Sequence, residues 1–135
     1  LAGPARGDTL EMRVHYVLPH FHALATGFEL FAVGGPNDGA LVFGTSMGIG
    51  DPLGGALAVP FDLSGATGLR LSCTYENPGD APVRWGANLD DEMCVVLAYI
   101  DGPQELAGGS MGTAVTTTLA DGTVVETSSC VAIAL

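Results

Sequence analysis

The sequence has no lysine, and its four arginines are set against fifteen aspartates and glutamates, for a formal net charge of −11. Proteins that bind nucleic acids need a basic surface that displaces counterions, so this balance excludes a nucleic-acid partner. A run of about 18 consecutive apolar residues is also missing, so no membrane span is expected. Nor does the sequence open with a basic start and a long apolar core, as a signal peptide would, so we expect a mature or excised piece.

The residues that are present favour an all-β fold. Of the 135 residues, 47% are hydrophobic and 14% are charged, with 20 glycines and 8 prolines, which is typical of short strands joined by tight turns. We expect residues 1–135 to form one domain, an antiparallel β-sandwich or jelly roll of about eight to ten strands. Strands are predicted over residues 9–18, 28–33, 40–43, 56–61, 69–75, 83–86, 94–100, 114–119, 123–126 and 131–134.

Apolar and polar residues alternate in the first predicted strand, which indicates one buried face. That face is expected to carry Leu10, Met12, Val14, Tyr16 and Leu18. His15 falls on the other face and is interpreted as an exposed strand histidine rather than a metal ligand. The continuous apolar run 94–100 predicts a strand buried on both faces at the centre of the core. Glycine-rich residues 44–55 and 108–112 are predicted connections, and Met47 within the first is interpreted as packing.

His20 and His22 lie two residues apart in a chain with only three histidines. In an extended strand, residues i and i+2 point to the same face with Cα atoms roughly 6.5 Å apart, so both rings can reach one metal ion. Pro19 interrupts strand pairing just before them, as at an edge or a bulge. The pattern predicts half of a metal site, with an ordinary polar strand face as the alternative.

A second stretch, residues 90–94 (Asp-Asp-Glu-Met-Cys), supplies a thioether at Met93. The three cysteines permit one disulfide and one spare thiol. A bridge between Cys73 and Cys94, on neighbouring predicted strands, would close a loop of about 20 residues, contribute about 3 kcal/mol and hold Met93 in one orientation. Such a bond indicates an oxidising compartment. The acids 90–92 are interpreted as a solvated loop, and Tyr75 and Trp85 as core aromatics rather than residues lining the site.

Two blocks of residues carry a family resemblance that covers roughly residues 8–101. The first is His20-x-His22 followed by Gly27, and the second runs from Cys73-x-Tyr75 through Asn77, Val83 and Gly86 to Asp91-Glu92-Met93-Cys94. Together they resemble the copper type II, ascorbate-dependent monooxygenases, which include peptidylglycine α-hydroxylating monooxygenase and dopamine β-monooxygenase. The resemblance implies one copper ion, at which dioxygen is activated, with His20, His22 and Met93 as ligands and a Cys73–Cys94 disulfide. Independently, two imidazoles and a thioether favour Cu(I) and leave a position open for a small molecule, with zinc ranked second.

The chain departs from that family at several positions. Family enzymes have a second domain whose copper stores an electron, and this sequence lacks the histidines for it. Leu18 stands where the peptide-amidating members have an arginine that grips a substrate carboxylate, and Val95 and Leu97 replace their asparagine and tyrosine. Peptide amidation is therefore not expected. Cys130 is interpreted as a buried free thiol, with a link to another chain or domain as the alternative.

The sequence thus predicts a secreted, periplasmic or extracellular β-sandwich that binds one copper ion. As an enzyme it would be an oxidoreductase that takes electrons from an external donor such as ascorbate. It would use dioxygen or peroxide to hydroxylate an unknown small organic substrate, alone or with an electron-storing partner domain. The alternatives are a non-enzymatic copper-binding or redox module, and a sandwich with a vestigial site that serves adhesion or assembly.

Overall fold

The computed structural model describes residues 9–47, 49, 53–110 and 113–134, and every ladder in them is antiparallel. These residues include no helix, and hence no helix that could cross a membrane. The predicted all-β class is confirmed. The strands are β1 (Arg13–His20), β2 (Ala25–Val33), β3 (Leu41–Ser46), β4 (Gly55–Asp62), β5 (Gly68–Tyr75), β6 (Val95–Asp101), β7 (Leu106–Ser110), β8 (Val115–Thr118), β9 (Val124–Thr127) and β10 (Cys130–Ala134).

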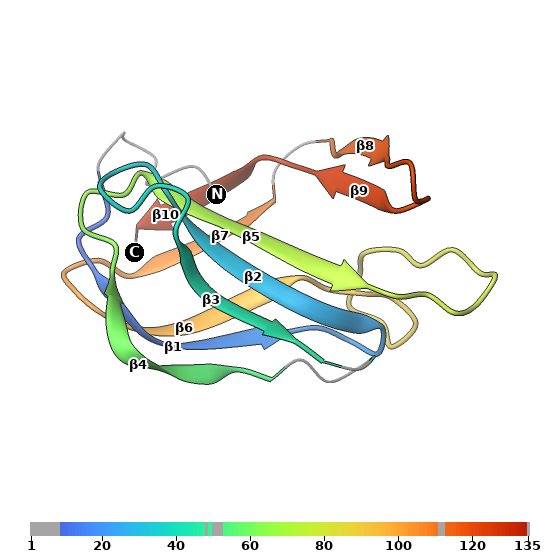
Figure 1. Ribbon diagram of the computed structural model, residues 1–135, viewed down its shortest axis with the longest axis horizontal. Helices are drawn as coiled ribbons and strands as arrows, with labels where there is room; N and C mark the ends of the chain where they lie inside the picture. Colours follow the sequence, from blue (N-terminus) through green and yellow to red (C-terminus); the bar gives the residue numbers. More distant parts are fainter. Residues whose placement is uncertain (1–8, 48, 50–52, 111–112, 135) are drawn as a thin grey trace.

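Two three-stranded sheets form the β-sandwich (Figure 1). One has the strand order β4-β1-β6 and the other the order β3-β2-β5. Strands β7 and β10 form a separate ladder, and the exposed β8–β9 hairpin makes another. Alternate residues of facing strands supply one core, as the period of two requires. The buried core residues are Leu10, Met12, Val14, Val17, Phe28, Leu30, Ala32, Val42, Leu63 and Ala66.

Both hairpins expected from turn residues are present. Strands β2 and β3 pair through a turn in which Gly34, Gly35 and Gly39 have φ values of 70°, 70° and 76°. Strands β8 and β9 pair through a turn with Gly122 at φ 87°. Glycine adopts this left-handed region without the steric cost that a Cβ imposes. The turn chemistry therefore determined where these strands reverse.

A bulge in β1 changes which residues face the core. Val14 pairs with Ile100 of β6 and Tyr16 with the next residue, Tyr99, so His15 is one extra residue on β1. A bulge inverts the alternation of side chains beyond it. Val17 is accordingly 0% exposed, whereas Tyr16 and Leu18 are 38% and 42% exposed. The prediction that Tyr16 and Leu18 share the buried face with Val14 was wrong.

Strand β6 is an edge strand and not the centre of the core. It pairs only with β1 among the described strands, and Leu97 and Tyr99 are 57% and 67% exposed. Its apolar run therefore has one half-buried face, through Val96 and Ile100, and one open face, against the prediction of burial on both. Two other segments, one predicted as a strand and one as a connection, also differ from expectation. Residues 83–86 form only an isolated bridge between Trp85 and Glu92, whereas residues 106–110, partly predicted as a link, form β7.

Candidate functional site

The two histidines of the predicted metal site lie together at one end of the sandwich. His20 ends β1 and His22 follows it, with the ring centroids 5.8 Å apart and the ring planes at 83°. His20 is exposed and His22 is half-buried. Phe21 between them packs on the core, with its ring centroid 6.0 Å from that of Phe28. The apolar residue anchors the segment and leaves both imidazoles at the surface.

His15 lies elsewhere, as expected from the sequence. Its Nε2 is 3.0 Å from the Asp101 carboxylate, and the Arg13 guanidinium lies 3.8 Å from the same carboxyl group. Its ring also contacts the ring of Tyr99, at 5.4 Å between centroids. His15 is the extra residue of the bulge and is half-buried, rather than fully exposed on a regular strand. It is thus a natural control histidine for experiments on the other two.

Hydrogen bonds of the Glu92 side chain connect the segment that carries His20 and His22 to the segment that carries Met93. This side chain is 7% exposed, the only buried polar or charged side chain in the described part of the chain. One carboxylate oxygen accepts the backbone N–H of His22 at 3.0 Å, and the other accepts that of Leu24 at 2.7 Å. Hydrogen bonds of this kind are strong because the acceptor is charged. The interpretation of residues 90–92 as a solvated acidic loop was therefore wrong for Glu92.

The His22 ring is oriented by a second contact. Its Nδ1 lies 2.8 Å from the backbone carbonyl oxygen of Asp91. A carbonyl only accepts, so Nδ1 carries the proton and donates it. In the neutral ring the lone pair is then on Nε2. Histidines that bind metals usually donate the N–H of their other ring nitrogen in this way, which sets the tautomer and the orientation of the ring. The sequence suggested His22 as a ligand but gave no sign of this contact.

Met93 lies beside this segment by strand register. His20 pairs with Val95 and Leu18 with Leu97 in the β1–β6 ladder, which ends there, so the chain from Met93 leads directly into the strand that flanks His20. The contacts of His22 with Asp91 and Glu92 agree with that placement. The backbone segments that carry the three suggested ligands therefore lie side by side.

The backbone around Met93 is held from both sides. Cys94 is bonded to Cys73 of β5, with the Cα atoms 5.9 Å apart, so the expected disulfide is present. The Tyr75 hydroxyl donates to the Met93 carbonyl oxygen, and the Tyr75 ring lies 6.5 Å from the Phe21 ring. Burial, reinforced by the charge of Glu92, raises the pKa of the Tyr75 phenol and keeps it a donor. Tyr75 thus contacts both halves of the site, which the interpretation as an ordinary core aromatic missed.

The available ligand types favour a soft metal ion. No three His, Cys, Asp or Glu side chains are grouped to hold a metal among the residues that the structure describes. A metal at the histidine pair therefore needs another donor, and the Met93 thioether is the candidate on the adjoining segment. Imidazole with thioether suits Cu(I), whereas zinc sites usually add thiolate or carboxylate. The residues thus fit copper better than zinc.

Trp85 differs from expectation, whereas Cys130 is the expected free thiol, although half-buried rather than buried. Trp85 is 75% exposed and not part of the core. Its segment bridges Glu92, since Glu92 N–H donates to the Arg84 carbonyl at 2.8 Å and Gly86 N–H donates to the Glu92 carbonyl at 3.1 Å. This places the backbone of Trp85 next to the residue before Met93. Cys130 is a free, half-buried thiol at the start of β10.

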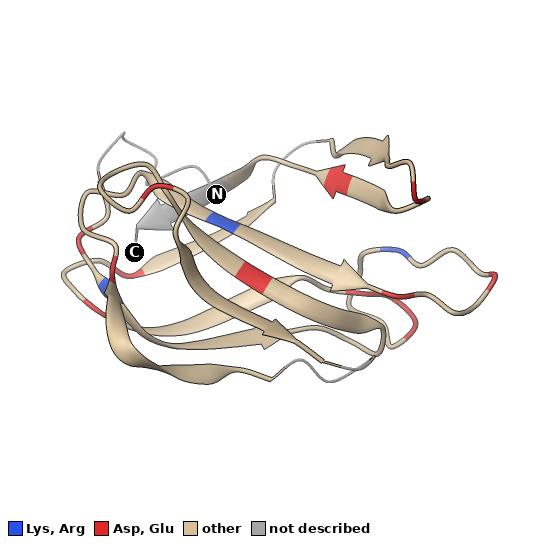
Figure 2. Ribbon diagram, in the orientation of Figure 1, with Lys and Arg blue, Asp and Glu red and all other residues tan. Residues whose placement is uncertain are grey.

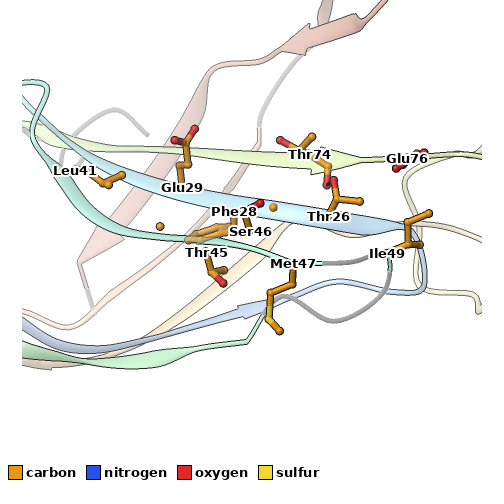
Figure 3. A pocket seen from close by; sticks show the side chains of 12 residues that line it. Thr26, Phe28, Glu29, Leu41, Thr45, Ser46, Met47, Ile49, Thr74 and Glu76 are labelled. Atoms are coloured by element: carbon orange, nitrogen blue, oxygen red, sulfur yellow. Dashed lines mark hydrogen bonds between the residues drawn. The ribbon is translucent and has the colours of Figure 1, made fainter.

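Apart from the histidine site, a hollow lies on the sheet β3-β2-β5 (Figure 3). It is an open cavity of about 760 Å³. Met47 lies in it, 43% exposed, and its backbone N–H donates to the Thr26 carbonyl oxygen at 3.0 Å. Glu29 and Glu76 supply its charge, with hydroxyl groups around them. Its lining residues are Thr26, Gly27, Phe28, Glu29, Leu41, Gly44, Thr45, Ser46, Met47, Ile49, Thr74 and Glu76.

Comparison with known proteins gave no relative for this chain. No protein-family model matches it, and neither does any curated protein or any solved structure. The resemblance to the copper monooxygenases consequently rests on the motif residues alone. Conclusions about function follow from the site described above.

Proposed function

We propose that this protein binds one copper ion through His20, His22 and Met93 and serves as an ascorbate-dependent copper oxidoreductase. The observation that carries the proposal is the pair of contacts on His22: its Nδ1–H donates to Asp91 and its backbone N–H donates to Glu92. These contacts fix the tautomer and join the histidine segment to Met93. A polar face that served only solubility would not need such anchoring.

The chain's own residues perform distinct tasks in this proposal. The Nε2 atom of His22 is left as the donor atom, and exposed His20 provides the second imidazole. The Cys73–Cys94 disulfide and the Tyr75 hydroxyl keep Met93 from repacking. Bound copper would supply one-electron redox chemistry with dioxygen or peroxide, and thereby hydroxylation of a C–H bond of a small organic substrate. The exposed side of His20 leaves room for that substrate.

The disulfide also supports the proposed location. Disulfides persist in oxidising compartments and are rare in the reducing cytosol. We therefore place the protein outside the cytoplasm, as a secreted or periplasmic protein. An external reductant such as ascorbate is consistent with that setting, and an electron-storing partner domain is an alternative source of the second electron.

A Cu(I) titration against a competing chelator tests the site. We expect one equivalent to bind the wild type and His20→Ala, His22→Ala and Met93→Ala each to weaken binding by about tenfold or more. His15→Ala and Met47→Leu are matched controls that remove a histidine and a thioether elsewhere and should bind as the wild type does. Equal binding by all six proteins would refute the copper site.

An assay of dioxygen consumption then distinguishes an enzyme from a non-enzymatic copper-binding module. With copper and ascorbate, the enzyme is expected to consume dioxygen faster than free copper does, and His22→Ala should abolish the excess. Tight Cu(I) binding without any such consumption, with or without an added electron-transfer partner, would instead indicate a module for copper capture or redox sensing.

A further inference from the structure

Four large side chains form an exposed apolar strip beside His20. Beyond the bulge, Tyr16, Leu18 and His20 alternate with buried Val17 and Pro19 and therefore share the outer face of the sheet. Their cross-strand partners on β6 are Tyr99, Leu97 and Val95, and directly paired residues lie on the same face. We define the apolar strip as Tyr16, Leu18, Leu97 and Tyr99, which are 38%, 42%, 57% and 67% exposed.

Small residues border the strip on the side that faces β4. Ala56 pairs with Tyr16 across the β1–β4 ladder. Gly54 lies next to Leu18, where an added Cβ would approach the Val17 carbonyl oxygen to 2.6 Å. Gly54 and Ala56 thus add no large side chain beside Tyr16 and Leu18, so these two remain accessible from this side.

Charge is absent along this part of the sheet. Residues 14–20 and 95–100 contain no Asp, Glu, Lys or Arg, although the chain carries a net charge of −11. Figure 2 shows charged residues of β1, β4 and β6 only toward the end of the sheet away from His20. The strip therefore offers no counter-ion to a carboxylate or an ammonium group, and the acidic remainder of the protein repels anions.

From these observations we infer that the apolar strip docks the substrate, and that the substrate is an uncharged, apolar molecule of small cross-section. This inference rests on the proposed function, because it takes His20 as the metal ligand at the end of the strip. Four residues of strand from Tyr16 to His20 span about 13 Å. A molecule lying on the strip would place its far end at the copper ligand.

A protein partner fits this face less well. Exposed apolar patches are often docking surfaces for proteins, but a partner that covered the strip would also cover His20, with which it is continuous. The site would then be closed to substrate. A narrow apolar molecule, in contrast, buries the strip and leaves the surroundings of His20 open.

Binding of the neutral fluorophore N-phenyl-1-naphthylamine to the oxidised protein tests the inference. We expect Leu97→Ser and Tyr99→Ser each to weaken binding about fivefold, because each removes part of the apolar contact area. Val115→Ser is the matched control, since Val115 is 67% exposed on β8, outside both sheets of the sandwich; it should bind the probe as the wild type does. All these side chains are exposed, so folding is expected to be retained, and thermal unfolding verifies it.

Quenching of the bound probe by Cu(II) is the second measurement. Bound Cu(II) is expected to quench the emission of the probe in the wild type but not in His20→Ala, and Leu97→Ser should retain wild-type Cu(I) affinity. Equal probe binding by all variants, or bound probe that Cu(II) leaves unquenched, would overturn the docking role while the copper site stands. Light scattering that shows a dimer in the wild type and a monomer in Leu97→Ser would also overturn it, since a second copy would then cover the strip. Probe binding without any copper binding would refute the proposed function instead.

Discussion

Replacing Glu92 tests the central structural argument most directly. The carboxylate accepts two backbone N–H groups, from His22 at 3.0 Å and Leu24 at 2.7 Å, and is 7% exposed. Hydrogen bonds to charged groups contribute about 1.5 to 3 kcal/mol each, and buried N–H groups left unpaired cost similar amounts. Glu92→Ala should therefore lower the free energy of unfolding by about 3 kcal/mol and Tm by roughly 10 °C. Glu92→Gln keeps one acceptor and should cost about 2 kcal/mol.

Urea denaturation of the oxidised protein measures the loss of stability, and amide hydrogen exchange locates it. Exchange should accelerate first at the N–H groups of His22 and Leu24, because these are the donors that lose their acceptor. Glu126→Gln is the matched control: it makes the same charge change on exposed β9 and should stay within about 0.5 kcal/mol of the wild type. The reasoning is refuted if Glu92→Gln is as stable as Glu126→Gln and the His22 and Leu24 amides remain protected.

Three further predictions concern the disulfide, the tryptophan and two acids. Replacing both Cys73 and Cys94 with serine should lower the free energy of unfolding by about 3 kcal/mol in urea titrations, because the closed loop has a sequence separation of 21; an unchanged midpoint would contradict this. Emission of Trp85, the single tryptophan, should be quenched by Cu(II) in the wild type and not in His22→Ala, since its segment bridges Glu92; equal quenching would place copper elsewhere. Hydrogen bonds from Ser64 lower the pKa of Asp62, and those from Thr123 lower the pKa of Asp121. The stabilisation by both acids should be complete above their unfolded value near 3.8 and be lost as pH falls below it. Acid melts of Asp62→Asn and Asp121→Asn should show a smaller loss than the wild type.

The fold class was predictable because the turn residues and strand periodicity act locally. Gly34 and Gly122 mark turns whose positive φ values only glycine adopts easily, and both hairpins were found where expected. The outcome for β6 was not predictable, because an apolar run does not say whether one or both faces are covered. Alternation likewise describes side-chain type and not strand register, so nothing in it revealed the extra residue at His15.

The candidate site was predictable only in part, for a related reason. The spacing of His20 and His22 and the neighbouring Met93 and Cys94 are local patterns, and the segments that carry them lie side by side in the structure. The contacts that join them link Glu92 to residues 68 to 70 positions away, and no local signal distinguishes Glu92 from its two acidic neighbours. Its role depends on the tertiary fold alone.

The bulge at His15 absorbs one extra residue of β1 without changing the side of the sheet on which His20 lies. Substitutions within Val14–Tyr16 leave the count of residues unchanged, so His20 stays on the solvent side. Deletion of His15 would remove the extra residue and still leave Tyr16, Leu18 and His20 on the solvent side, because each keeps its partner in β6. Deletion of one residue between Tyr16 and His20 has no bulge to absorb it and would turn His20 towards the core. In evolutionary terms, this strand can change by one residue in length at the bulge but not beyond it. Any alignment of β1 that slips by one at this point would assign the wrong residue as a ligand.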